Sequence, residues 1–196
     1  QQTPPIPWNG VYGFRQGGTF NGVAQQLPYL QRLGARAIWL SPVLKNSKPA
    51  EWAYNYHGYA AQDFLNVDER FASDGTRATA ESELRSLVDA AHARGLYVIL
   101  DIVLNHGARV FDYLLGDTTH AELMSQEVMS RPLGAEPKIR WLDGLGFPRE
   151  GWTDTLPGSG LSADDAVWPR ELQRADFFRR RGSKLGDAVS GDGGFV

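Results

Sequence analysis

The first half of this chain alternates short apolar runs with helical patterns, and this alternation constrains the fold more than any other feature. Apolar runs at 10–14, 37–40 and 97–104 predict three strands. The segments between them repeat apolar residues at helical spacing, with Asn21 expected to cap the first helix and Thr79 to open the second. Apolar strands joined by helices favour a parallel α/β sheet with right-handed crossovers.

Glycine and proline punctuate this pattern. Gly34 and Gly95 are placed to end the two helices, whereas Pro28 predicts a kink or a late start in the first. The segment 43–77 reads as a long connection. After Gly107 the alternation stops, and only two further helices are expected, near 121–129 and 169–181. A closed eight-stranded barrel typically takes about 250 residues, so we expect the chain to be too short to complete one.

A polar cluster follows the third predicted strand. Asp101, Asn105 and His106 stand at the end of an otherwise apolar run. A charged side chain in a buried strand is costly unless it is paired with an opposite charge or has a function. Barrel enzymes have their active sites at the C-terminal ends of parallel strands. These residues are therefore candidates for a functional site.

Composition narrows the class of protein. The chain has 196 residues, of which 42% are hydrophobic and 22% charged, with a net charge of −3. Its basic residues are scattered apart from 179–181, so no nucleic-acid partner is expected. There is no cysteine, which excludes disulfides and thiolate chemistry, and no apolar stretch approaches the ~20 residues needed to span a bilayer. The chain begins at Gln1, as a processed or excised chain would.

Five sequence stretches together resemble those of a known protein family. They are GVYGF, LPYLQRLGARAIWLSPV, NYHGYAAQDF, GLYVILDIVLNH and VWPRELQ, in that order along the chain. Together they resemble the N-terminal part of the α-amylase family of glycoside hydrolases and transglycosidases. The resemblance implies an incomplete (β/α)8 TIM-type barrel, with its first three strand-helix units in 1–104. It also implies that 105–196 is an irregular inserted domain B, truncated before the fourth strand.

The resemblance also assigns roles to particular residues. Asp101 resembles the strand-end carboxylate that holds an arginine beside the catalytic nucleophile, and His106 the histidine that hydrogen-bonds the sugar. Tyr59 resembles the aromatic platform under the sugar ring, and His57 a further contact to it. Asn105 matches a position where many members bind a structural calcium, whose other ligands cannot be chosen from sequence among Asp112, Asp117, Asp143 and Asp154.

Each of these residues also has a purely structural interpretation. Asp101 could be a capped buried aspartate, and His106 could be tied to a neighbouring loop. The tyrosine-rich segment could serve packing, and Asp63 could either orient Tyr59 or cap a loop. The tryptophans at 141, 152 and 168 are interpreted as packing residues.

The functional expectation follows from the resemblance. Retaining glycosidases use two carboxylates about 5 to 5.5 Å apart, and in this family these follow the fourth and fifth strands, which the chain does not contain. We expect the parent protein to be a retaining enzyme acting on α-linked glucans or maltooligosaccharides, located outside the cytoplasm in the periplasm or extracellular space. The isolated chain is expected to be inactive and to need the remainder of the barrel or a second chain. No organic cofactor is expected. The alternative is a non-catalytic carbohydrate-binding or assembly protein.

Overall fold

The computed structural model describes residues 18–47, 57–113, 138–153, 155–179 and 194–195. The predicted strand at 10–14 and the predicted helix at 121–129 lie outside these ranges. The elements are α1 (Phe20–Arg32), β1 (Ala37–Leu40), β2 (Leu44–Asn46), β3 (Ala61–Val67), η2 (Glu69–Phe71), α2 (Arg77–His92), β4 (Tyr97–Leu100), β5 (Phe111–Tyr113), β6 (Ile139–Trp141), η4 (Arg170–Leu172), η5 (Ala175–Phe177), β7 (Phe178–Arg179) and β8 (Gly194–Phe195).

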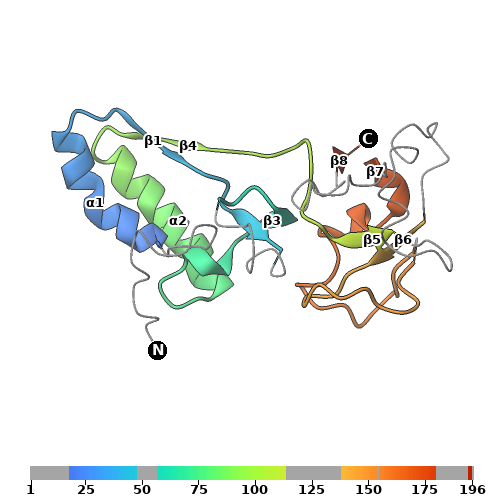
Figure 1. The fold of residues 1–196 in the computed structure, drawn as a ribbon. Coiled ribbons are helices and arrows are strands. Elements are labelled where there is room, and N and C mark those ends of the chain that lie inside the picture. The colour runs from blue at the N-terminus through green and yellow to red at the C-terminus, as the bar shows by residue number, and fades with distance from the viewer. Residues whose placement is uncertain (1–17, 48–56, 114–137, 154, 180–193, 196) are drawn as a thin grey trace, which may run out of the picture.

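The first layer joins two helices to a parallel strand pair. β1 and β4 pair in parallel from Ala37↔Tyr97 to Leu40↔Leu100, and α1 and α2 pack side by side against them (Figure 1). Leu27 and Leu87, both fully buried, meet Ile38 in the resulting core. The predicted parallel α/β arrangement is therefore present in the described residues.

The opposite face of this strand pair is open among the described residues. Side chains alternate along a strand, so Ala37, Trp39, Tyr97 and Ile99 all point away from the helices. Trp39 is 71% exposed and Tyr97 72% exposed. An apolar sheet face of this kind is normally covered in parallel α/β proteins.

The helix boundaries differ from those predicted. α1 begins at Phe20 because Thr19, not Asn21, accepts a hydrogen bond from the Gly22 amide. The helix continues through Pro28 rather than starting late, since Leu27 buries its side chain beside it. α2 begins at Arg77, and Thr79 lies inside it with its amide donated to the Thr76 cap. Gly34 and Gly95 follow the helix ends with positive φ, as predicted.

Two strands were missed in the segment 43–77. β2 and β3 pair antiparallel, although their sequences are not apolar. Lys45, Asn46, Gln62 and Asp63 are all buried there. Lys45, Asn46 and the Gln62 Nε2 group have hydrogen-bond or ion-pair partners that are remote in sequence, which periodicity cannot reveal. The predicted strand 97–104 is also shorter than expected: β4 ends at Leu100, where its partner β1 ends before Pro42.

A second core forms around Trp141. Trp141 is fully buried and makes edge contacts with Phe111 and Phe178, so its interpretation as a packing residue is confirmed. The predicted helix at 169–181 is wrong. Two single 3-10 turns and the strand β7 stand there, because Gln173 leaves helical geometry and donates its side-chain amide to the Val167 carbonyl.

β3 connects the two cores. The Phe64 amide donates to the Trp168 carbonyl (3.0 Å), and the Trp168 amide donates to the Gln62 carbonyl (2.8 Å). Lys45 adds an ion pair to Asp164 (2.5 Å). The assignment of 105–196 to a domain B stays a prediction. No helix in the described part of the chain is long and apolar enough to cross a membrane.

Candidate functional site

Three of the predicted site residues meet at the end of β4. The Tyr59 hydroxyl donates to Asp101 Oδ2 (2.6 Å), and His106 Nε2 lies 3.1 Å from the Tyr59 carbonyl oxygen. Asp101 directly follows β4, at the C-terminal end of the parallel pair. Tyr59, Asp101 and His106, to which the resemblance assigned roles in one sugar site, are therefore in direct contact.

Gly58 allows the chain to bring Tyr59 to this point. Its φ of +86° is in the left-handed region, and a Cβ there would lie 2.7 Å from the Pro42 carbonyl oxygen. The loop before β3 thus packs closely against the turn after β1. This contact places Tyr59 beside the end of β4.

His57 supports Tyr59 from its own loop. Its Nδ1 accepts the Tyr59 amide (2.9 Å), and the two rings lie 5.5 Å apart at 52°. An acceptor nitrogen must carry no proton. Burial, reinforced by the charge of His106, holds the pKa of His57 below 6.5 and favours this neutral form.

The Tyr59 phenol is held as a hydrogen-bond donor. Its hydrogen bond to Asp101, then desolvation and the Asp101 charge, raise the pKa of Tyr59 above 10.0. The side chain remains 38% exposed. An oriented and accessible ring is thus available to a ligand.

His106 is tied to the neighbouring loop, as its structural interpretation proposed. A carbonyl oxygen only accepts, so the Nε2 facing Tyr59 carries the proton. In the neutral ring Nδ1 is then an acceptor. A hydroxyl-bearing ligand would have to be bound through that atom.

Asp63 does not orient Tyr59. Its carboxylate accepts the Leu65 amide (2.9 Å) and the Asn66 side chain (2.5 Å), so it caps its own segment. Asn46 was missed by sequence reasoning. Its Oδ1 accepts the amide of Ala60, the residue after Tyr59 (2.9 Å). A buried asparagine in a short polar strand gives no periodic signal that could have identified it.

Asp112 and Asp143, the two candidate calcium ligands that the structure describes, are both paired with arginines. Asn105 is exposed, Asp112 pairs with Arg109, and Asp143 accepts backbone amides and pairs with Arg149. Asp117 and Asp154 lie outside the described ranges. No group of three His, Cys, Asp or Glu residues in the described part of the chain could hold a metal.

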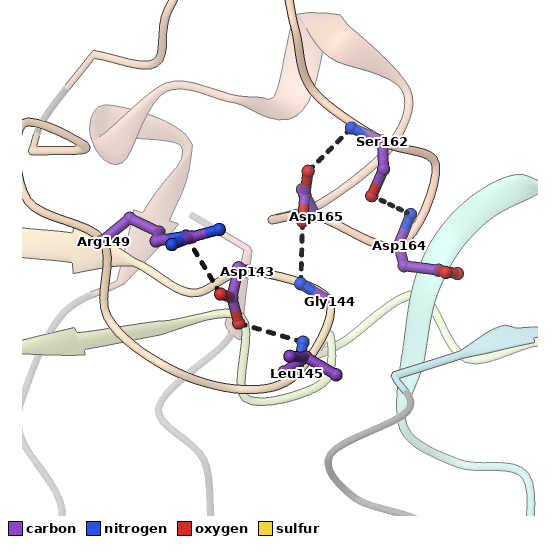
Figure 2. Close-up of a pocket in the computed structure, with 7 residues that line it drawn as sticks. All are labelled: Asp143, Gly144, Leu145, Arg149, Ser162, Asp164 and Asp165. Carbon is purple, nitrogen blue, oxygen red and sulfur yellow. Dashed lines mark hydrogen bonds and ion pairs between the residues drawn. The ribbon is translucent and has the colours of Figure 1, made fainter.

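A pocket beside the second core contains none of Tyr59, His57, Asp101, Asn105 or His106, and of the candidate calcium ligands it contains only Asp143 (Figure 2). Asp165 bridges the Gly144 and Ser162 amides, and Asp164 pairs with Lys45. The carboxylates of this pocket therefore stabilise the surrounding loops through hydrogen bonds and an ion pair. The lining residues are Asp143, Gly144, Leu145, Arg149, Ser162, Asp164 and Asp165.

Known proteins are similar to half or more of this chain. It is 30% identical over 178 residues to the periplasmic alpha-amylase of Escherichia coli K12, covering 84% of this chain and 25% of that protein. It is 37% identical over 106 residues to an alpha-amylase of Streptomyces lividans, covering 52% of this chain and 11% of that protein. A crystal structure of an alpha-amylase from Geobacillus thermoleovorans complexed with acarbose shares 32% identity over 61% of this chain and 23% of that one, with a TM-score of 0.42.

The chain thus spans about a quarter or less of the length of these relatives. A family model described as the alpha-amylase catalytic domain matches residues 8–145, which is well over half of the chain and includes Tyr59, Asp101 and His106. This chain belongs to the alpha-amylase family of glycoside hydrolases.

Proposed function

We propose that this chain supplies substrate-binding residues to a retaining hydrolase or transglycosidase that acts on α-linked glucans. The contact of Tyr59 with Asp101 and His106 at the end of β4 is the observation that carries the proposal. β1 and β4 would be the second and third strands of a (β/α)8 barrel, and the cluster would then lie at its catalytic mouth.

Each residue of the cluster has a defined role in this proposal. The Tyr59 ring offers an apolar face to the C–H groups of a pyranose. Its bond to Asp101 fixes the ring before the sugar arrives, which lowers the entropy cost of binding. His106 would accept a sugar hydroxyl at Nδ1, while His57 holds the Tyr59 amide. Asp101 has further acceptor capacity for an arginine beside the nucleophile.

The chemical step needs residues beyond those matched here. Double displacement requires a nucleophile and an acid–base carboxylate about 5 to 5.5 Å apart. By the family resemblance, these two carboxylates would follow the fourth and fifth barrel strands, which are not among the strands predicted from this sequence. The 196-residue chain on its own should therefore show no turnover. It should act with the remaining barrel strands, supplied by the same protein or by a second chain.

Relatives support the substrate class and the compartment. The matched proteins are named alpha-amylases, one is named as periplasmic, and one was crystallised with acarbose. We accordingly propose maltooligosaccharides as ligands and a location outside the cytoplasm. Calcium at Asn105 stays a prediction, and its remaining ligands would have to come from beyond the described residues.

Sugar binding tests the proposal directly. Maltoheptaose should bind the chain more tightly than cellohexaose in a titration followed by NMR, and Tyr59→Ala should abolish the difference. Tyr29→Ala is the matched control, since Tyr29 is 51% exposed on α1 and far from the cluster in sequence. An equal loss of maltoheptaose affinity in the two variants would contradict the assignment of Tyr59 as a sugar-binding residue. Binding without any turnover when the remaining barrel strands are supplied would favour the non-catalytic alternative.

A further inference from the structure

The peptide group between Tyr59 and Ala60 is held at both of its polar atoms by side chains. His106 Nε2 donates to its carbonyl oxygen (3.1 Å), and Asn46 Oδ1 accepts its N–H (2.9 Å). The next carbonyl, that of Ala60, accepts the Ser47 amide (3.0 Å). The plane of this peptide is therefore fixed immediately after the tyrosine.

The Asn46 side chain can adopt only one amide orientation here. Its Nδ2 donates to the Leu44 carbonyl (2.7 Å) while its Oδ1 faces the Ala60 N–H. Exchanging the two atoms would set donor against donor and acceptor against acceptor. Asn46 is also 2% exposed, so water cannot replace either partner without opening the strand pair.

Asp68 anchors Asn46 in turn. Its Oδ2 accepts the Asn46 backbone amide (3.0 Å), and its carboxylate is paired with Arg70. Burial alone would raise the pKa of Asp68, but Arg70 and the amides of Asn46 and Arg70 outweigh it and hold the pKa below 3.8. A charged, 1% exposed carboxylate thus fixes the backbone of β2 under the Tyr59 loop.

We propose that Asn46 is a positioning residue for sugar binding, which holds the Tyr59–Ala60 peptide so that the Tyr59 phenol reaches Asp101. Asn46 touches no ligand itself and acts only through Tyr59. This inference rests on the proposed role of Tyr59 as the sugar platform. It adds Asn46 of β2, which lies thirteen positions before Tyr59, to the residues that maintain the site.

Two measurements without sugar test the positioning. In Asn46→Ala the Ala60 amide should exchange with solvent about tenfold faster, as loss of one buried hydrogen bond requires. The Tyr59 pKa, followed by NMR of labelled tyrosine, should fall back toward 10.0. Asn66→Ala is the matched control, because Asn66 bonds to Asp63 in β3 and does not contact the Tyr59–Ala60 peptide. It should leave both values unchanged.

Tyr59→Phe supplies a test that does not depend on how well the Asn46 variant folds. It removes the bond to Asp101 and leaves the Asn46 contact in place. Protection of the Ala60 amide should survive this substitution, and its loss would overturn the proposal. An unchanged Tyr59 pKa in folded Asn46→Ala protein would also overturn it.

Maltoheptaose affinity then connects positioning to function. Asn46→Ala should weaken binding about tenfold and add nothing further in a Tyr59→Ala background. Equal additional loss in that background would show that Asn46 acts independently of Tyr59. If no variant binds sugar, the proposed function fails, while the exchange and pKa results still decide the positioning role.

Discussion

Substitution of Gly58 by alanine should loosen the Tyr59 loop more than the same substitution at Gly34. The two glycines have nearly the same φ, +86° and +87°. They differ in what a Cβ would meet. At Gly58 it would lie 2.7 Å from the Pro42 carbonyl oxygen, whereas at Gly34 nothing lies within 4 Å.

The expected magnitude follows from this difference. Both variants carry the cost of an L-residue at positive φ, roughly 1–2 kcal/mol, partly offset by the stiffer unfolded chain. Gly58→Ala also forces a backbone carbonyl to move, because no rotamer change can relieve a clash with main-chain atoms. Overpacking of this kind costs about 1–3 kcal/mol. Gly58→Ala should therefore destabilise its loop by about 1–3 kcal/mol more than Gly34→Ala does.

Amide hydrogen exchange measures the effect locally, without requiring a global unfolding transition. The reporters for Gly58→Ala are the amides of Tyr59, Ala60 and Ser47, which are all hydrogen-bonded around the loop. The reporter for Gly34→Ala is the Ala35 amide, which donates to Leu30. Exchange should accelerate about 5- to 150-fold more at the first site than at the second. Equal acceleration at the two sites would refute the close-approach argument.

Three further predictions concern charge and surface. His57 has a lowered folded pKa, so the stability that its hydrogen bond contributes is complete above pH 6.5 and is lost as the pH falls toward the folded value. The protection factor of the Tyr59 amide, which is the intrinsic exchange rate divided by the observed rate at the same pH, should therefore fall on acidification, and this fall should vanish in His57→Gln. Asp68→Asn should lower the free energy of unfolding by about 3 kcal/mol because it breaks a buried ion pair. Asp176→Asn breaks a solvent-exposed pair and should lower the free energy of unfolding far less; both are measured by urea denaturation. We expect the isolated chain to self-associate through the open sheet face. Trp39→Ser should then weaken this self-association at least about tenfold in sedimentation experiments by removing apolar area from that face, and Tyr29→Ser on α1 should not; equal behaviour would argue against that face as the contact.

The sequence by itself determined the helix–strand layer and the residue types at the site. The apolar periodicity of α1, α2, β1 and β4 is local, so it could be detected without the fold. The polar end of β4 was visible as chemistry that a core would not contain, whereas Tyr59 was singled out only by the family resemblance. The cap of α1 is Thr19, two residues before the expected Asn21, and α2 begins at Arg77, two residues before Thr79, because it is capped by Thr76.

Only the tertiary structure decided how that chemistry is held. From the sequence, Lys45 and Asn46 were interpreted as loop residues. Their burial is favourable only because of partners elsewhere in the chain, which are Asp164 for Lys45 and the Ala60 amide for Asn46. Tyr59 lies 42 residues from Asp101 and 47 from His106. Hydrogen bonds of this range depend on where the backbone turns, at Gly58 and Pro42, and not on any local propensity. The residue types of the site could therefore be identified from the sequence, whereas their hydrogen bonds depend on long loops that bring distant residues together.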